Sequence, residues 1–299
     1  MEFSPAVPRH DSIQTRIPAR QTVPVVVASP HSGSLYPATF LAAAAVPLAA
    51  LRRAEDAFVD ELFAAAPSFG MPFVAARFPR SYVDANRESY ELDPAMFEGP
   101  LPRPLNHRTS RVAAGLGMIP RVAASGEAIY RTRLPADEIE RRLETCWRPY
   151  HSALTLLVEQ TYRQFNCAWL IDAHSMPSSA AGLGPRDREP RVDIVLGDNH
   201  GEACSTLLVA SVEHWLRAQG LRVQRNLPYA GGFTTQRYGR PMTGRHVLQI
   251  EINRALYMDE GRHEKLPAWH EIELLMTGLL AQIGQTAAET LLPRSLAAE

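Results

Sequence analysis

The chain has 299 residues, of which 45% are hydrophobic, so it is long and apolar enough to bury a large core. Its 31 Lys and Arg residues nearly balance its 32 Asp and Glu residues, and the formal net charge is −1. Because such a chain has no strong positive field to hold a polyanion or an anionic lipid surface, we expect neither a nucleic acid nor a membrane as its partner.

The cysteines and the N-terminus bear on the compartment. Cys146, Cys167 and Cys204 are scattered and have no C-x-x-C spacing, which argues against a disulfide framework and against a thiolate zinc site. The N-terminal residues carry an acid at Glu2 and lack the apolar core of a signal peptide, so they predict no export. The longest apolar stretch, residues 40–51, is far shorter than the roughly 20 residues that cross a bilayer. These features predict a cytoplasmic protein.

Strands and helices alternate along the first half of the chain. An apolar, largely β-branched run at 23–28 predicts a buried strand. Residues 51–66 place their apolar side chains on one helical face, and residues 73–77 predict a short strand. Residues 89–130 contain many Pro and Gly and little periodicity, which is typical of a functional lid or binding loop.

The second half continues this alternation. A strong helical pattern covers residues 137–166 and is interrupted near Pro149. The other expected elements are strands at 192–196, 221–224 and 246–252, helices at 204–218 and 266–291, and a glycine-rich loop at 229–241. Together they predict a three-layer α/β fold whose central, mostly parallel mixed sheet has helices on both faces. We expect an N-terminal arm at 1–20 and a single α/β domain at 21–299.

Two histidines follow predicted strands in the same way. The strand that begins at Val23 leads into Pro30-His31-Ser32-Gly33, and the strand at 168–171 leads into Asp172-Ala173-His174-Ser175. Because ligands bind outside the carboxyl ends of the strands in an open α/β sheet, His31 and His174 can converge on one point. Two imidazoles in a cleft predict a metal site for one ion, zinc first, with other divalent transition metals also possible. Each histidine could instead be a packed or surface residue.

Three acidic residues are candidates for this site. Asp56 or Glu55, after the first histidine, could supply a third ligand. Glu251 lies in a strand that is otherwise apolar, and a buried carboxylate is costly unless it has a partner or a task. The alternatives are that Asp56 and Glu55 are solvated helix acids and that Glu251 pairs with an arginine in a structural ion pair.

Arg80, Arg87, Arg237 and Arg240 all lie in Gly-, Pro- or Asn-rich segments rather than on regular amphipathic faces. Because the planar guanidinium binds carboxylates through two parallel hydrogen bonds, this set predicts an acidic small molecule as the ligand. The alternative is that these arginines only keep the surface soluble.

The chain resembles the N-formylglutamate amidohydrolase family over most of its length. The resemblance is carried, in chain order, by Ser29-Pro30-His31-Ser32-Gly33, Asp56, Arg80 with Asp84-x-Asn86-Arg87, Ile129-Tyr130, Trp147-Arg148-Pro149-Tyr150-His151, Asp172-Ala173-His174-Ser175, Gly197-Asp198, Gly231-Gly232, Tyr238-Gly239-Arg240-Pro241, Gln249-x-Glu251 and Tyr257-Met258. This family is similar in turn to the zinc carboxypeptidases and aspartoacylases. The resemblance therefore implies a carboxypeptidase-like fold, one zinc ion and hydrolysis of an amide beside a carboxylate.

The resemblance also implies roles for individual residues. Those relatives have a glutamate ligand three residues after the first histidine, whereas this chain has Ser34 there. The carboxylate ligand then becomes Asp56, with Glu55 as the second choice. Asn86 and Arg87 match a pair that binds the α-carboxylate of the substrate. Arg80 resembles the arginine that polarises the oxyanion, and Glu251 matches the general acid/base.

The expected reaction is hydrolysis of an N-acyl acidic amino acid, foremost N-formyl-L-glutamate, to L-glutamate and formate. Arg237 or Arg240 would hold the second substrate carboxylate. The alternatives on the same site are another N-acyl amino acid deacylase or a small carboxypeptidase. A metal-free binding protein for acidic metabolites is the alternative from another class. A nucleophilic hydrolase built on Ser32 or Ser175 is a weaker option, because neither serine lies in a G-x-S-x-G elbow.

Overall fold

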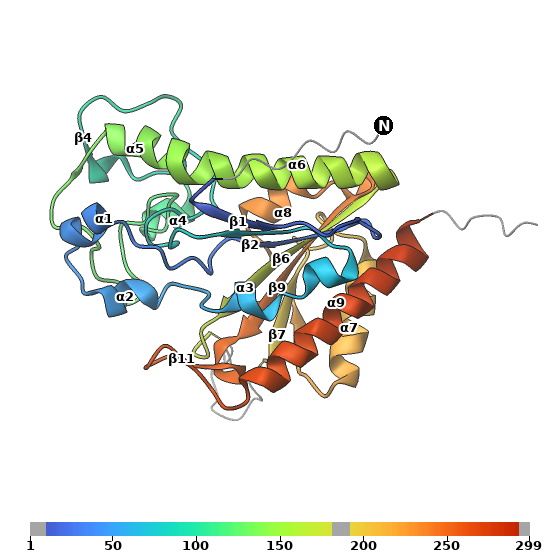
Figure 1. Cartoon of the computed structure of the whole chain (residues 1–299). Coiled ribbons are helices and arrows are strands. Elements are labelled where there is room, and N and C mark those ends of the chain that lie inside the picture. Colours follow the sequence, from blue (N-terminus) through green and yellow to red (C-terminus); the bar gives the residue numbers. More distant parts are fainter. Residues whose placement is uncertain (1–9, 181–191, 293–299) are drawn as a thin grey trace, which may run out of the picture.

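A computed structural model describes residues 10–180 and 192–292, and its centre is a seven-stranded sheet in the order β1-β3-β2-β6-β9-β7-β8 (Figure 1). These strands are β1 (Ile13–Arg16), β2 (Val25–Ser29), β3 (Phe73–Ala76), β6 (Ala168–Met176), β7 (Ile194–Gly197), β8 (Val223–Arg225) and β9 (Arg245–Asn253). The strands β3, β2, β6 and β9 pair in parallel, while β1 and β7 join antiparallel to β3 and β9. The predicted mixed, mostly parallel sheet is confirmed.

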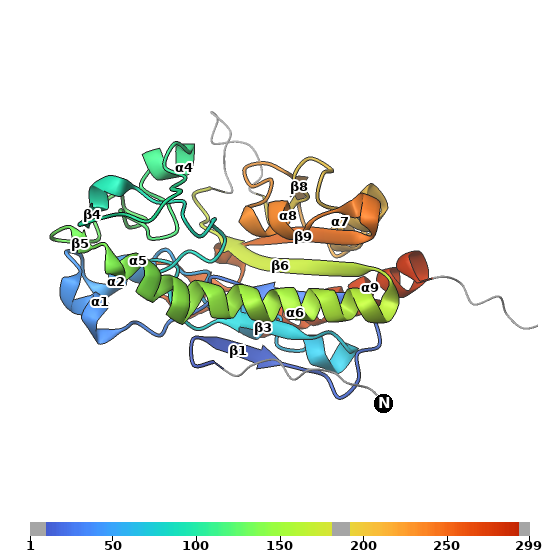
Figure 2. The ribbon, with the colours of Figure 1, turned by 90° about the horizontal axis from the view of Figure 1, so that it is seen from above.

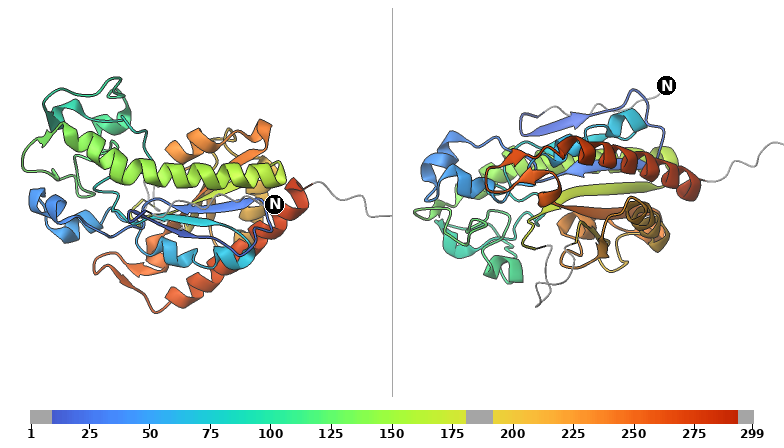
Figure 3. Two further views of the ribbon diagram at one scale, coloured as in Figure 1. Left: turned by 45° about the horizontal axis from the view of Figure 1, so that its top comes forward. Right: turned by 90° about the horizontal axis from the view of Figure 1, so that it is seen from below.

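Helices cover both faces of the sheet, as predicted. The side chains of β2 alternate between the two faces, so that Val26 and Ala28 pack with α6 (Arg148–Phe165), and Val25 and Val27 pack into the opposite core. The opposite core is closed by α3 (Val59–Leu62), α7 (Thr206–Ala218) and α9 (Trp269–Leu291). Figure 3 shows α6 and α9 on opposite sides of the strands. This arrangement is the predicted three-layer α/β fold.

One part of the expected N-terminal arm belongs to the sheet. Residues Ile13–Arg16 form β1 and pair with β3 along its outer edge, where Ile13 is buried and the Arg16 guanidinium lies over the Phe73 ring. Only Ile13 of the four residues is buried, so backbone pairing with β3 holds this strand, and the sequence has too few apolar residues there to show a strand pattern. The predicted domain boundary at residue 21 therefore leaves out four residues that belong to the sheet.

The helix predicted at 51–66 is also wrong, because the chain breaks in its middle. The structure has α2 (Leu48–Arg52), then an irregular turn, then α3, and a 3-10 turn at Ala66–Phe69. Phe58 adopts a left-handed backbone with a φ of 65°, and the backbone N–H of Asp56 donates to the carbonyl of His31 at 3.0 Å. These tertiary contacts outweigh helical periodicity and turn Asp56 toward the sheet.

The remaining expectations agree with the structure apart from local details. The helix α5 (Asp137–Arg142) continues into α6 through a π-helical turn at Leu143–Trp147, directly before Pro149, whose missing N–H cannot complete a regular turn. The glycine-rich loop contains one short helix, α8 (Phe233–Tyr238). No helix in the described part of the chain is both long and apolar enough to cross a membrane.

Residues 89–130 are mostly irregular, as expected, with one short helix, α4 (Ser110–Ala113). The strand β4 (Phe97–Glu98) of this segment pairs with β5 (Leu134–Pro135). In Figure 2 these elements gather beyond the carboxyl end of β6, together with α1 (Ala38–Ala43). The segment 89–130 therefore stands at the edge of the sheet where parallel strands end.

A further small sheet joins β10 (Met258–Asp259) to β11 (Glu264–Lys265).

Candidate active site

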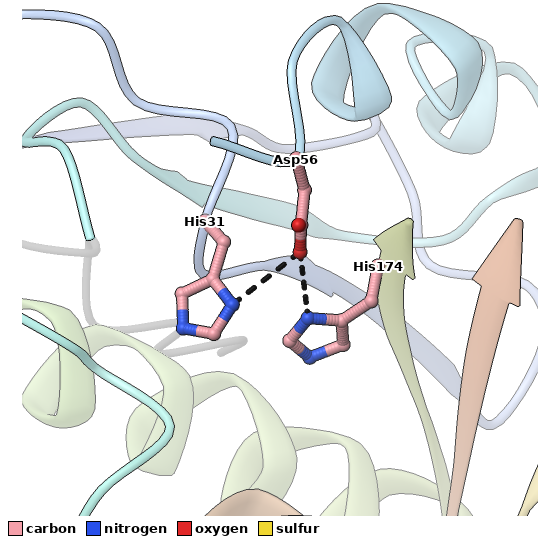
Figure 4. Close-up of side chains that lie close together, drawn as sticks. All are labelled: His31, Asp56 and His174. Atoms are coloured by element: carbon pink, nitrogen blue, oxygen red, sulfur yellow. Dashed lines mark hydrogen bonds and ion pairs between the residues drawn. The ribbon is translucent and has the colours of Figure 1, made fainter. Parts of the chain in front are cut away.

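Two histidines and one aspartate converge at the carboxyl end of the sheet (Figure 4). His31 follows β2 directly and His174 lies in the neighbouring parallel strand β6, so their ring centroids are 4.8 Å apart. The Oδ2 atom of Asp56, from the turn between α2 and α3, lies 3.3 Å from Nδ1 of His31 and 2.9 Å from Nδ1 of His174. All three side chains are buried.

The donor atoms of this group fit a divalent metal ion. The three potential ligand atoms lie within 4.8 Å of one another, and the Nδ1 atom of His31 is buried without a hydrogen bond. Two imidazole nitrogens and a carboxylate oxygen are ligands that zinc and related transition metals accept. Glu55 does not reach the histidines, because its carboxylate accepts from Tyr36 Oη at 2.6 Å and pairs with His263 Nε2 at 2.9 Å. Asp56 is thus the carboxylate that the structure brings to His31 and His174.

The outer nitrogen of each imidazole faces another buried carboxylate. His31 Nε2 lies 2.7 Å from Asp84 Oδ1, and His174 Nε2 lies 3.1 Å from Asp172 Oδ2. A carboxylate that hydrogen-bonds the outer nitrogen fixes the tautomer and orientation of a metal-binding imidazole, as Asp84 does for His31. The Asp172 oxygens make no hydrogen bond within the described residues, so Asp172 contributes negative charge beside His174. We did not assign these roles to Asp84 or Asp172 from the sequence, although the D-x-H spacing in a strand puts Asp172 and His174 on the same face.

Arg254 is a further site residue that the sequence reasoning missed. Its Nη2 donates to Asp56 Oδ1 at 2.9 Å, and its Nε donates to Ser175 Oγ at 3.1 Å. Burial disfavours the charge on Asp56, but the hydrogen bond from His174, together with the charges of His31 and Arg80, holds the pKa of the Asp56 carboxyl well below its ordinary value. Asp56 is therefore an ionised carboxylate with one oxygen held by Arg254 and the other facing the histidines.

Glu251 stands beside this group because of the strand register. In the parallel pair of β6 and β9, Glu251 is the direct partner of His174, and its Oε1 accepts a hydrogen bond from Gln249 Nε2 at 2.8 Å. Burial, assisted by the charge of Asp56 and opposed by His174, Arg80 and Arg254, raises the pKa of Glu251 to about 7. A carboxyl group with that pKa can take up and release a proton near neutral pH.

A cavity of about 460 Å³ opens over these residues. Its lining includes His31, His174, Glu251, Arg80, Asn86 and Arg87 from the predicted set. Among the described residues, five arginines and two acidic residues line it, so this part of the wall carries an excess of positive charge. A cavity of this size with a few convergent polar groups suits a small molecule, and its charge favours an anionic one.

Arg80 and Arg87 are held in different ways. Arg80 Nη2 pairs with Asp84 Oδ2 at 2.9 Å and its Nη1 lies 3.8 Å from Asp56 Oδ1. Although burial opposes its charge, Asp84, Asp56 and Glu251 raise the pKa of Arg80 above its ordinary value. Arg87 donates from Nε to the Leu116 carbonyl at 3.0 Å and from Nη1 to the Asn86 carbonyl at 2.8 Å, which leaves other N–H groups of its guanidinium for a ligand.

The Asn86 amide makes its contacts within the protein. Its Oδ1 accepts from the backbone N–H of Thr234 at 2.8 Å, and its Nδ2 lies 3.3 Å from His174 Nε2 and 3.4 Å from Gln249 Oε1. A Cβ added at Gly232 would come within 2.4 Å of Asn86 Nδ2, so the close approach of the 231–232 backbone requires glycine. Asn86 thereby fixes the glycine-rich loop against the cavity.

Arg237 and Arg240 are not brought to this cavity, contrary to the sequence prediction. Arg237, near the end of α8, and Arg240, just after it, line a separate, more open hollow that Glu88 and Thr155 also line. The Arg237 guanidinium packs over the Phe233 ring, and Arg240 Nη1 donates to the Gln236 carbonyl at 2.7 Å. The loop residues that do line the main cavity are Tyr229, Ala230, Gly231 and Gly232.

The comparisons with known proteins agree on one family. The model of the family described as N-formylglutamate amidohydrolase matches residues 23–258. The chain is 31% identical over 245 residues to the N-formylglutamate deformylase of Pseudomonas aeruginosa, covering 81% of this chain and 84% of that protein. It is 29% identical over 208 residues to the N-formylglutamate deformylase of Pseudomonas putida, covering 69% of this chain and 71% of that protein.

Solved structures extend this comparison. The crystal structure of an N-formylglutamate amidohydrolase from Ralstonia eutropha JMP134 superimposes with a TM-score of 0.88 at 39% identity, over 93% of this chain and 99% of the other. An Agrobacterium tumefaciens protein shares the fold, with a TM-score of 0.63 at 18% identity over 93% of this chain and 94% of the other. The chain belongs to the N-formylglutamate amidohydrolase family.

Proposed function

We propose that this chain hydrolyses the amide of N-formyl-L-glutamate to L-glutamate and formate, with one divalent metal ion, zinc first, held by His31, Asp56 and His174. The observation that carries the proposal is the meeting of two imidazole Nδ1 atoms and one carboxylate oxygen beside Glu251 in a cationic cavity. The relatives named N-formylglutamate deformylase support the choice of substrate.

The residues around the three ligands keep them ready for the ion. Asp84 holds Nε2 of His31, and Asp172 lies 3.1 Å from Nε2 of His174, so that both Nδ1 atoms are turned toward Asp56. Arg254 holds the other oxygen of Asp56. A zinc ion bound there would supply Lewis acidity, which lowers the pKa of water and polarises a carbonyl group.

Glu251 carries the proton in this proposal. The ionised carboxylate of Glu251 accepts a proton from the attacking water, and the resulting carboxylic acid then gives this proton to the departing amine of glutamate. A pKa of about 7 suits both directions, because neither the carboxylate nor the carboxylic acid is strongly favoured near neutral pH. The register of β6 and β9 places Glu251 beside His174, next to the three proposed ligands.

The arginines stabilise negative charge. Arg80 is fixed by Asp84 and lies near both Asp56 and Glu251, where its guanidinium can meet the oxyanion that develops on the formyl carbonyl. Arg87 lies next to Arg80 and would hold the α-carboxylate with its remaining N–H groups. Asn86 supports this wall through its contacts to Thr234 and Gln249.

The test is formate release from N-formyl-L-glutamate by the purified protein, measured before and after chelation and again after addition of zinc. The Glu251→Gln variant should bind the metal and turn over about 10²- to 10⁴-fold more slowly, because general acid/base catalysis is worth that factor. Parallel assay of N-acetyl-L-glutamate separates a deformylase from a broader deacylase. Undiminished formate release after complete metal removal, or by Glu251→Gln, would contradict the proposal.

A further inference from the structure

Arg111 differs from three of the four other arginines that line the cavity. The fourth, Arg53, is exposed and likewise makes no side-chain hydrogen bond or ion pair with a described residue, but it stands on the other side of the site, where its carbonyl accepts from Arg254 Nη1 at 3.0 Å. Arg80 pairs with Asp84, Arg254 pairs with Asp56, and Arg87 donates to two backbone carbonyls. Arg111 also lines the cavity, yet its guanidinium makes no hydrogen bond or ion pair with any residue in the described ranges 10–180 and 192–292. Its donors are therefore available to a ligand.

The backbone holds Arg111 beside Arg87 in a defined place. Arg111 belongs to α4, whose N-terminus is capped by the Thr109 side chain, which accepts from the Val112 N–H at 3.1 Å. The Leu116 N–H donates to the Arg111 carbonyl at 2.8 Å, and the Leu116 carbonyl accepts from Arg87 Nε at 3.0 Å. One residue, Leu116, thus connects the two arginines through consecutive hydrogen bonds.

The two guanidinium groups also interact electrostatically. Burial and the like charges of Arg80 and Arg111, opposed by Asp84, lower the pKa of Arg87. Two acids act on Arg87, and both have other partners: Asp84 accepts from His31 and Arg80, and the buried Glu91 accepts from Thr109 Oγ1 at 2.7 Å. Two adjacent arginines whose positive charges are only partly neutralised form a site for an anionic group, and their planar guanidinium groups favour carboxylates.

Contacts connect the three arginines in a row that begins at Asp56. Arg80 approaches Asp56 within 3.8 Å, Arg87 approaches Asp84 within 3.7 Å, and Arg111 acts on Arg87 from the wall built by α4. The polar groups of an N-formyl acidic amino acid follow in the same order from the reacting carbonyl to the α-carboxylate and then to the side-chain carboxylate.

We propose that Arg111 binds the side-chain carboxylate of the substrate and thereby determines the preference for acidic over neutral N-formyl amino acids. This inference rests on the proposed deformylase function. Arg111 takes the role that the sequence suggested for Arg237 or Arg240, and it takes it from the segment 89–130.

The test compares N-formyl-L-glutamate with N-formyl-L-glutamine, which has nearly the same shape but an uncharged side chain. The wild type should favour the glutamate substrate, and Arg111→Ala should lower kcat/KM for it about 10- to 100-fold, mainly through KM, as expected for a lost charged hydrogen bond. The glutamine substrate should change less than about threefold, and Arg111→Lys should keep part of the preference. Arg108→Ala, an exposed arginine on the same segment outside the cavity lining, is the matched control and should behave as wild type.

Three results would speak against the inference. An equal loss for both substrates in Arg111→Ala would show a structural role, and an equal rate on both substrates in the wild type would show that no such selectivity exists. If the wild type hydrolyses neither substrate, the deformylase proposal itself is wrong. Calorimetric binding of L-glutamate and L-glutamine to wild type and Arg111→Ala then decides the role of Arg111 alone, and an unchanged preference for L-glutamate in the variant would overturn it.

Discussion

Replacing Asp84 by asparagine tests whether the buried carboxylates behind the histidines position the metal ligands. Asp84 accepts hydrogen bonds from His31 Nε2 at 2.7 Å, from Arg80 Nη2 at 2.9 Å and from the Asn86 backbone N–H at 2.9 Å. Burial disfavours its charge, but Arg87, His31 and Arg80 hold the pKa of the Asp84 carboxyl well below its ordinary value. Asparagine keeps the shape and one acceptor oxygen, removes the charge and turns an NH₂ group toward one of the donors.

The magnitude follows from these contacts. A hydrogen bond to a charged group contributes about 1.5–3 kcal/mol, and Asp84→Asn breaks at least one of them. The Arg80 side chain is 26% exposed, so water compensates part of the loss on that side, whereas His31 is fully enclosed. We therefore expect the free energy of unfolding of the metal-free protein to fall by about 2 kcal/mol. Zinc affinity should fall about 10- to 100-fold, the range measured when residues behind metal ligands are changed.

Urea unfolding measures the first quantity, and competition for zinc with a chromophoric chelator measures the second. The matched control is Asp93→Asn, an aspartate whose carboxylate pairs with Arg121 near the surface, and it should bind zinc as the wild type does. A zinc affinity of Asp84→Asn within threefold of the wild type would refute the positioning argument.

Three further predictions concern the cavity and its surroundings. Because Glu251 has a pKa of about 7 and must be ionised to accept a proton, kcat/KM should fall as the pH decreases below about 7. A bound cation would move the midpoint of this fall to lower pH. If Glu251→Gln shows the same fall at low pH, another group is responsible for it. Gly232→Ala should reduce formate release by displacing Asn86, with little change in far-UV circular dichroism, since its Cβ would lie 2.4 Å from Asn86 Nδ2. Arg237→Ala and Arg240→Ala should leave KM for N-formyl-L-glutamate within about threefold, because both residues line a different hollow; a large rise in KM would restore the original prediction.

The central part of the site could be predicted from the sequence because regular strands carry it. An apolar run followed by a histidine defines both the strand and the edge at which it ends, and parallel pairing then brings His31 and His174 together. Glu251 was recognisable as a carboxylate in an otherwise apolar strand, and the register places it beside His174.

The parts that could not be predicted depend on contacts between distant irregular segments. Nothing in the helical pattern of 51–66 reveals the break that turns Asp56 inward, because the break is stabilised by the His31 carbonyl. Arg254 and Arg111 resemble ordinary surface arginines in the sequence, and only the folded loops direct them to Asp56 and to the cavity. Arg237 was misplaced because a glycine-rich loop gives no indication of the short helix that turns it away.

The most direct test of the account is an anomalous diffraction measurement at the zinc absorption edge on crystals grown with zinc and L-glutamate. We predict one peak bonded to Nδ1 of His31, Nδ1 of His174 and Oδ2 of Asp56, at the distances of about 2.0–2.2 Å that zinc adopts with these ligands. Zinc bound elsewhere, or bound through other atoms while these three residues remain free, would contradict the account.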